Sequence, residues 1–166
     1  SPQKLLSDIR KDFKIISGIP HEKDPYNNYV PQTDITGDCR KPVNLIDSIL
    51  IKGARRNSKE GFVDYNYLTF IYAGLFDFTK KSPSKISLEV ACSRSFGGAV
   101  QVYADAILPE NKIAEIPVDE KFKTANNKDF KYITVPLLKK ITGKRHLIFT
   151  CDGFFTYNLR SWYISD

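Results

Sequence analysis

Histidine, the side chain most often used as a general base, occurs only twice in this 166-residue chain. The two histidines are His21, in a polar stretch, and His146, at the start of an apolar one. The sequence has no G-x-S-x-G elbow, no H-E-x-x-H helix and no glycine-rich phosphate loop. Catalysis by an activated nucleophile and a base therefore has little support.

Hydrolysis of a glycosidic bond needs only two carboxylates at a suitable separation. The acidic side chains that could supply such a pair are Glu60, Asp64, Asp105, Asp129 and Asp152. They do not cluster at alternating positions along one strand, which is where jelly-roll glycosidases carry theirs. We therefore expect that the chain is not itself an enzyme.

Aromatic residues are abundant, with eleven Phe, nine Tyr and one Trp. Flat rings cover the C–H patches of sugars, and a few hydrogen bonds then orient the sugar. Rings interleaved with Lys and Arg also suit single-stranded nucleic acid. The basic runs at 52–56 and 139–140 are short and scattered, however, and the net charge is +6. We therefore expect no nucleic-acid partner.

Two apolar alternations in the middle of the chain predict half-buried strands at 85–92 and 99–105. The Ser-Arg-Ser-Phe-Gly-Gly run between them suits a turn. We expect a hairpin with one solvated face, on which Glu89, Gln101 and Tyr103 point outward.

Further strands are predicted at 113–118, 131–137, 145–151 and 159–164, with a loop at 121–129. Trp162 lies in the last of these strands, where we expect it in the core. The cysteines Cys39, Cys92 and Cys151 have no C-x-x-C spacing, and their odd number excludes a fully paired set within one chain. Cys92 and Cys151 end alternating patterns and are expected to be buried small hydrophobes.

Residues 1–16 carry Leu5, Leu6, Ile9, Phe13 and Ile16 at three- and four-residue steps, which predicts a short amphipathic helix. We interpret 1–26 as a linker or remnant segment that includes this helix; a docking helix for a partner is the alternative. No apolar run reaches the roughly 20 residues of a membrane span, so no membrane partner is expected. Because the chain has no methionine, we expect it to be a piece of a longer protein.

Six short motifs follow one another after residue 62. They are YLTF at 67–70, I-x-L-x-VA at 86–91, GG at 97–98, V-x-VYAD at 100–105, TGK-x-HL-x-F at 142–149 and YNL at 157–159. In this order they resemble a carbohydrate-binding module of family six. That family is a β-sandwich usually appended to secreted polysaccharide hydrolases.

The resemblance implies an all-β sandwich, or jelly roll, over 27–166. It implies a non-catalytic module that is extracellular, secreted or at the cell surface and that keeps an attached glycoside hydrolase near its substrate. Xylan or arabinoxylan is the first expectation for the ligand, followed by β-glucan or agarose. The alternative is a degenerate, non-binding structural module of a larger glycoside hydrolase.

The resemblance also implies a ligand site. The family builds a loop-end cleft from an aromatic before the first matched strand, an aromatic in the loop before a Thr-Val strand, and the asparagine of the final Asn-Leu pair. Those positions fall at Phe62 or Tyr65, at Phe130 or Tyr132, and at Asn158. Some members bind glucan on a sheet face instead, which makes the expected solvated face a second candidate surface.

A structural calcium is the only cofactor that the resemblance implies. The family's opening strand carries glutamates that help to hold it, whereas the corresponding stretch here, 29–34, has none. The family's aspartate after Asn-Leu is also replaced, since Arg160 and Ser161 follow Leu159. Hard cations need several oxygen ligands, and expected carboxylates are missing, so no metal ligand is assigned.

Overall fold

The computed structural model describes residues 34–93, 98–118, 122–152 and 157–166, and it confirms the all-β fold class. The predicted helix at 1–16 and the whole of 1–26 lie outside these residues. The described strands are β1 (Val43–Asn44), β2 (Leu50–Asn57), β3 (Phe62–Asp77), β4 (Lys85–Ala91), β5 (Ala99–Ala104), β6 (Lys112–Pro117), β7 (Lys131–Pro136), β8 (Lys144–Asp152) and β9 (Asn158–Ser165). Two short 3-10 helices, η2 (Leu45–Asp47) and η3 (Pro109–Asn111), connect them.

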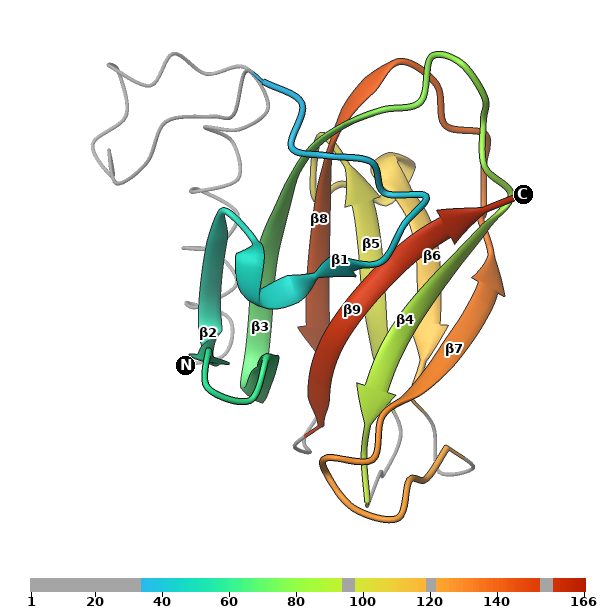
Figure 1. Ribbon diagram of the computed structural model, residues 1–166. Helices are drawn as coiled ribbons and strands as arrows, with labels where there is room; N and C mark the ends of the chain where they lie inside the picture. The colour runs from blue at the N-terminus through green and yellow to red at the C-terminus, as the bar shows by residue number, and fades with distance from the viewer. Residues whose placement is uncertain (1–33, 94–97, 119–121, 153–156) are drawn as a thin grey trace.

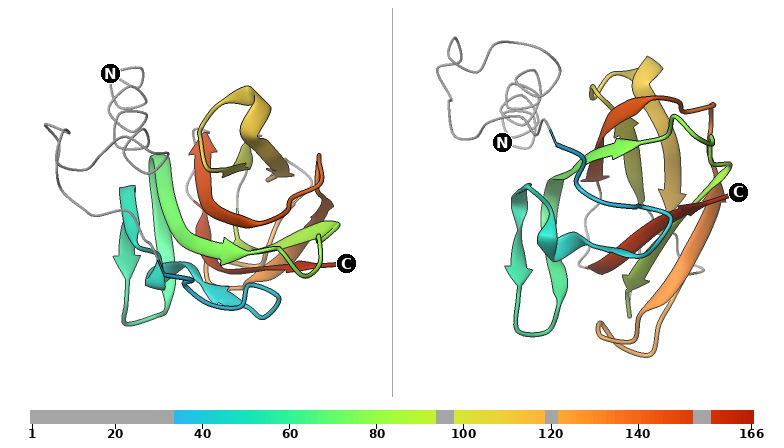
Figure 2. Two further views of the ribbon diagram at one scale, coloured as in Figure 1. Left: turned by 90° about the horizontal axis from the view of Figure 1, so that it is seen from above. Right: turned by 45° about the horizontal axis from the view of Figure 1, so that its top comes forward.

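All the strand pairs are antiparallel, in the order β6-β5-β8-β3-β9-β4-β7, with β1 added to β9 and β2 added to β3. The long strand β3 belongs to both halves of the sheet, because it pairs with β8 along 69–77 and with β9 at 63–64. The sheet therefore curls so that β5, β6 and β8 lie across from β4, β7 and β9 (Figures 1 and 2). The result is a nearly closed β-sandwich.

The main core lies between these two halves. It takes the inward residues of every long strand, among them Ile71, Leu88, Val102 and Phe149. Trp162 is fully buried in it, with ring centroids 5.1 Å from Phe76 and 5.3 Å from Phe149. The core position predicted for this tryptophan is confirmed.

The three cysteines are free and buried, as expected for Cys92 and Cys151. Burial raises the pKa of the Cys39 thiol to about 12, because the thiolate would lose its hydration. These side chains pack as small hydrophobes.

The predicted hairpin of 85–92 with 99–105 is wrong. β4 pairs with β7 and β9, whereas β5 pairs with β6 and β8, so the connection between β4 and β5 crosses from one half of the sandwich to the other. The single solvated face fails with it, since Glu89 and the pair Gln101 and Tyr103 lie on different outer faces. Alternation shows which residues face the core, but it does not show which strand lies alongside.

The described chain begins against β3. Thr36 exchanges two hydrogen bonds with Leu75: its N–H donates to the Leu75 oxygen (2.8 Å), and its Oγ1 accepts from the Leu75 N–H (2.9 Å). The Thr36 side chain fills the space beside Gly74, where any Cβ would overlap it. Gly74 also has φ +141°, so the close approach and the backbone conformation both favour glycine.

Candidate functional site on the outer face of β4, β7 and β9

Two residues of β9 point outward where a regular strand would present one. Leu88 is opposite Trp162 and Val90 is opposite Leu159, so the single residue Glu89 of β4 faces two residues of β9. These two are Arg160 and Ser161. The extra residue is a β-bulge, a feature that redirects side chains at a sheet surface.

The bulge surrounds Glu89 with donors. Arg160 Nε donates to Glu89 Oε1 (2.7 Å), Arg160 Nη2 donates to Oε2 (2.6 Å), and Ser161 Oγ donates to Oε1 (3.0 Å). These bonds hold the pKa of Glu89 below its usual range, against the effect of burial, and the same pairing raises the pKa of Arg160. Glu89 is only 8% exposed, so a fully bonded carboxylate anchors this face.

Tyr132 of β7 extends the same network toward solvent. Register places it opposite Glu89, and its hydroxyl shares a hydrogen bond of 2.7 Å with Ser161 Oγ. Tyr163 meets its ring edge-on, with centroids 5.3 Å apart. The ring is nevertheless 42% exposed. It is thus an exposed aromatic face whose orientation is fixed from two sides.

Phe130 and Phe62 lie at the loop end of this surface. The Arg160 guanidinium carbon sits 4.3 Å from the Phe130 ring centroid, and the Phe130 and Phe62 rings are tilted at 48° with centroids 5.6 Å apart. A sugar held between two rings needs about 4 Å of contact distance on each side, or roughly 8 Å in all. This pair is therefore closed, and Phe62, at 4% exposure, lies beneath Phe130.

Asn158 begins β9 at the same end. It is 8% exposed, and its Nδ2 donates to the Asn127 carbonyl (2.6 Å). Asn127 Oδ1 in turn accepts from the N–H and Oγ of Ser93, both at 2.9 Å. None of the hydrogen bonds between described residues uses Asn158 Oδ1, which leaves an acceptor for a ligand hydroxyl.

The structure thus brings together four of the five predicted site residues along one surface, from Asn158 and Phe62 through Phe130 to Tyr132. The backbone of Tyr65 pairs with Ala54 in β2, and its side chain lies outside the described residues. Sequence reasoning missed Arg160, Ser161, Tyr163 and Asn127 as parts of the site. The sequence did carry a signal for the bulge. Residues that share one face of a regular strand are two positions apart, whereas the core residues Leu159 and Trp162 are three apart.

Four of the five candidate glycosidase carboxylates have another partner. Glu60 pairs with Lys128 (2.7 Å), which ties the 122–130 loop to the turn between β2 and β3. Asp64 pairs with Arg55 and Asp105 with Arg145, at 2.9 and 3.1 Å. Asp129 Oδ2 accepts from the Ala125 N–H (3.1 Å), and the Asp152 side chain lies outside the described residues.

The calcium that the resemblance implies has no cluster of carboxylates to hold it in the described part of the chain. Within 34–93, 98–118, 122–152 and 157–166, no three His, Cys, Asp or Glu side chains gather as a metal would require. Arg160, which stands where the resemblance expects an aspartate, instead places a cation beside Glu89. Residues 29–33, the other expected ligand stretch, lie outside the described residues.

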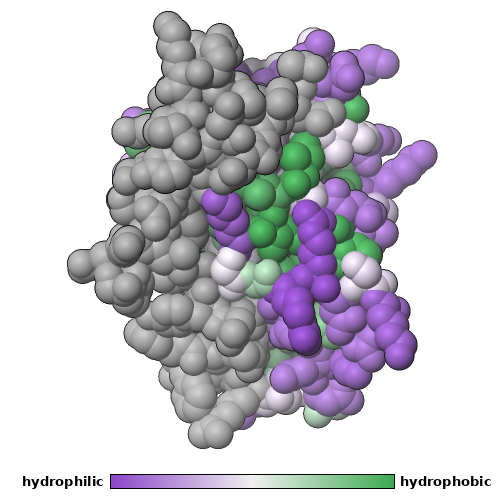
Figure 3. All heavy atoms as spheres, turned by 90° about the vertical axis from the view of Figure 1, so that its left-hand side faces the viewer, coloured by the Kyte–Doolittle hydropathy of each residue, from purple (hydrophilic) through white to green (hydrophobic). Residues whose placement is uncertain are grey.

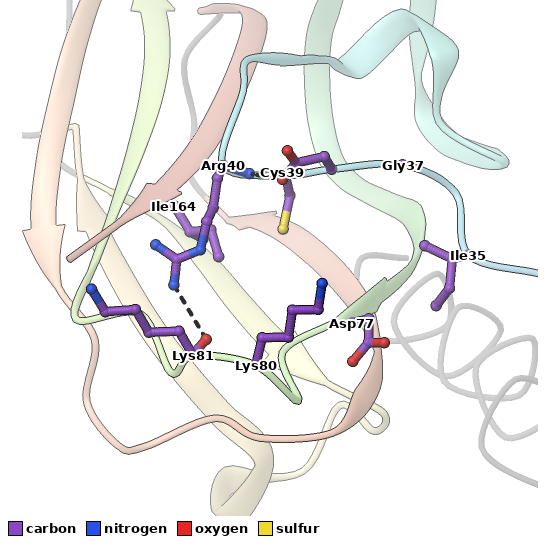
Figure 4. A pocket seen from close by; sticks show the side chains of 9 residues that line it. Ile35, Gly37, Cys39, Arg40, Asp77, Lys80, Lys81 and Ile164 are labelled. Carbon is purple, nitrogen blue, oxygen red and sulfur yellow. Dashed lines mark hydrogen bonds between the residues drawn. The ribbon is translucent and has the colours of Figure 1, made fainter.

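A cavity of about 470 Å³ lies at the opposite end of β9 (Figure 4). Cys39 and Ile164 line it together with Arg40, Lys80 and Asp77, and Arg40 donates to the Lys81 carbonyl across it (3.2 Å). Its lining has three cations, two carboxylates and no aromatic ring, so it lacks the features of a sugar site. Separately, none of the helices in the described ranges is long and apolar enough to cross a membrane.

Comparison with solved structures shows which proteins share this fold. A family 6 carbohydrate-binding module from Clostridium cellulolyticum, solved in complex with xylose, covers 78% of this chain and 100% of its own, with 17% sequence identity and a TM-score of 0.67. A glycoside hydrolase family 43 arabinoxylan arabinofuranohydrolase from Bacillus subtilis, solved with cellotetraose, covers 84% of this chain and 30% of its own (18%, 0.64). A carbohydrate-binding module of family 36, solved in complex with calcium and xylotriose, covers 75% of this chain and 99% of its own. Its sequence identity is 16% and its TM-score is 0.56.

These similarities confirm the expected fold, that of family 6 carbohydrate-binding modules. No protein-family model matches the sequence, and no curated protein matches it. At such low identity the shared fold does not settle which ligand this chain binds. The ligand has to be argued from the side chains on its surface.

Proposed function

We propose that this chain is a non-catalytic module that binds a neutral plant or algal polysaccharide, with xylan or arabinoxylan as the first candidate. The observation that carries the proposal is the exposed, fixed ring of Tyr132 beside Arg160 on the outer face of β4, β7 and β9. A sugar ring would lie on the Tyr132 face, and nearby polar atoms would orient its hydroxyls.

The charges of the surface favour a neutral ligand. Both oxygens of Glu89 are engaged by Arg160, so the pair presents little net charge to a ligand. Along the same surface, the remaining Arg160 N–H groups are hydrogen-bond donors and the Asn158 Oδ1 is an acceptor. Sugar hydroxyls can use both, because each hydroxyl donates and accepts.

The expected affinity is modest. Covering one ring buries roughly 100 Å² of apolar surface, worth about 2.5 kcal/mol at 25 cal/mol/Å² before losses. One or two rings and a few hydrogen bonds then give a Kd on the order of 10 to 100 μM. Affinity of that order suits a module that raises the local concentration of substrate for a tethered enzyme.

The proposal also includes an attached enzyme and a place where the module acts. A solved hydrolase contains a region with this fold, which spans 30% of that chain, so a comparable attachment is expected here. The module would then act outside the cell or at its surface, where polysaccharide substrates lie. The ligand residues we propose are Tyr132, Phe130, Asn158, Phe62 and Tyr65. Of these, Phe62 would touch a sugar only if Phe130 moved aside.

The test is affinity gel electrophoresis of the wild type in xylan, mixed-linkage glucan, laminarin and agarose. One of these polymers should retard the protein, and Tyr132→Ala should weaken that binding about 30-fold, the equivalent of about 2 kcal/mol. The matched control is Leu138→Ala, which truncates another exposed side chain (59%) just beyond the far end of β7. The control should migrate as the wild type does.

A different result would redirect the proposal. Retardation that survives Tyr132→Ala but fails in Asn158→Ala would move the site to the loop end, provided that the variant melts at the wild-type temperature. Retardation by none of the four polymers would contradict the binding proposal. It would favour the alternative of a structural module, for which the closed pair of Phe62 and Phe130 is the supporting observation.

A further inference from the structure

The outer face of the other half of the sheet carries an apolar row beside polar residues such as Gln101 and Thr150. Leu50 of β2, Tyr72 of β3, Ile148 of β8 and Tyr103 of β5 lie side by side in register across four strands. Tyr72, Ile148, Tyr103 and Phe70 form a hydrophobic cluster separate from the main core, here called the outer cluster. An antiparallel sheet with one face in water normally alternates apolar and polar residues. Here the outer cluster is buried on what would be the solvated face, with Phe70, Tyr72 and Ile148 at 0% exposure, so this part of the second face also needs an apolar cover.

Few of the described residues pack on the outer cluster. They are Ile49, Leu50, Ala106 and Ile107, and each is itself only partly buried. Figure 3 views the molecule from the left-hand side of Figure 1 and shows a group of hydrophobic side chains among hydrophilic ones on that side. The four strands that carry the row from Leu50 to Tyr103 span about 14 Å at roughly 4.8 Å per strand. One α-helix, about 10 Å across, fits such a face.

The chain carries a segment of the matching kind before its first described residue. Residues 1–16 place five apolar side chains on one side of a helix and Lys4, Lys11 and Lys14 on the other. A helix of this length, about 24 Å, is marginal in water unless its apolar side packs against something. It therefore needs a surface like the outer cluster.

The connection between the two is short enough. The described chain starts at Asp34, and Thr36 is hydrogen-bonded to Leu75, which lies three residues from Tyr72 on the same strand. Residues 17–33 can extend to about 55 Å, which is more than the face requires. A tether of this length keeps the segment at an effective concentration in the millimolar range.

We propose that residues 1–16 form an amphipathic helix whose apolar side, Leu5, Leu6, Ile9, Phe13 and Ile16, covers the outer cluster of the same chain. The helix is then part of the folded module and not a free linker. The proposal does not depend on sugar binding, because the outer cluster and Tyr132 lie on opposite halves of the sheet. It also reserves the Tyr103 face for the helix, so that polysaccharide is left with the β4, β7 and β9 face.

The first test is cysteine cross-linking in the full chain. One cysteine replaces Leu50 at the edge of the outer cluster, and a second replaces Leu6, Ile9 or Phe13 in turn. The three natural cysteines are buried and do not compete. We expect an intramolecular disulfide to form rapidly from at least one of the three positions, because a docked helix holds the two Cα atoms within about 7 Å of each other.

Matched controls carry the second cysteine at Lys4 or Lys11, on the opposite side of the predicted helix. Neither should cross-link at a comparable rate. Equal rates from both sides, or no closure from any apolar position, would overturn the proposal. Disulfides that form only between two molecules would assign the face to a second copy of the chain, and would overturn it as well.

The second test measures whether the outer cluster becomes exposed when the helix is disrupted. Phe13→Asp places a charge on the apolar side, whereas Lys11→Asp places the same charge on the polar side. The first should lower the unfolding temperature and raise the binding of a hydrophobic dye such as ANS several-fold, because apolar surface is uncovered. The second should match the wild type. Identical melting and dye binding in both variants would contradict a docked helix.

Discussion

Arg160 holds Glu89 by two parallel hydrogen bonds, from Nε to Oε1 at 2.7 Å and from Nη2 to Oε2 at 2.6 Å. The pair joins β9 to β4, and the guanidinium also covers the Phe130 ring at 4.3 Å. One side chain thus links a buried carboxylate to the loop-end aromatics. Loss of Arg160 should therefore disturb both the stability of the sheet and the shape of the proposed sugar surface.

Replacing Arg160 by Met removes the charge and keeps much of the side-chain length. We expect a loss of about 1 to 3 kcal/mol in the free energy of unfolding, because Glu89 is left buried without its partner. The loss of stability should stay in this range because the Arg160 side chain is 43% exposed and water screens its attraction to Glu89. Urea unfolding measures the change. The double variant with Glu89→Gln should recover part of the loss, and no recovery would show that Arg160 acts through Phe130 instead.

Acid should destabilise the protein partly through Glu89. Its folded pKa is depressed by the hydrogen bonds from Arg160, so its contribution to stability is complete above the unfolded value, near 4.3, and is lost as pH falls through the folded value. The free energy of unfolding, measured from pH 6 to pH 3, should therefore fall more steeply in the wild type than in Glu89→Gln. Parallel curves for the two proteins would mean that Glu89 titrates alike in the folded and unfolded chain.

The strands could be predicted from the sequence because burial leaves a periodic trace. Alternation at 145–151 marks the inward residues of β8, and the strand predicted at 159–164 placed Trp162 in the core. The pairing of β4 with β9, and of β5 with β8, joins residues between about 40 and 80 positions apart in the chain. No local pattern encodes such a partner, so the mistaken hairpin between neighbouring strands followed from chain order alone.

The candidate site was only partly predictable for a related reason. Asn158 and the aromatics were identified because they match motifs by type and order. The role of Arg160 depends on the bulge in β9, which turns two consecutive residues toward one carboxylate. Likewise, the closed contact of Phe62 with Phe130 depends on how the 122–130 loop lies against β3, which spacing in sequence does not specify.

Gly74→Ala should be strongly destabilising. The added Cβ would overlap the Thr36 side chain, and φ +141° is a conformation that costs a non-glycine residue about 1 to 3 kcal/mol by itself. The matched control is Gly143→Ala, where φ is +73° and no atom lies within 4 Å of the added Cβ. Thermal unfolding should therefore show a larger loss for Gly74→Ala. Equal losses would mean that the contact with Thr36 yields without cost, and adding Thr36→Ala to Gly74→Ala should separate overlap from backbone strain.

Removal of calcium should leave the unfolding temperature unchanged. Arg160 follows the Asn158-Leu159 pair where the resembled family has an aspartate, and its guanidinium occupies the oxygens of Glu89 that a cation could otherwise use. A positive charge at that position also repels a divalent ion. Thermal unfolding in EDTA and in millimolar calcium, run on the same preparation, should therefore coincide. A rise in unfolding temperature with calcium that EDTA reverses would show that ligands other than the described carboxylates hold an ion, and stretch 29–34 would be the first place to substitute.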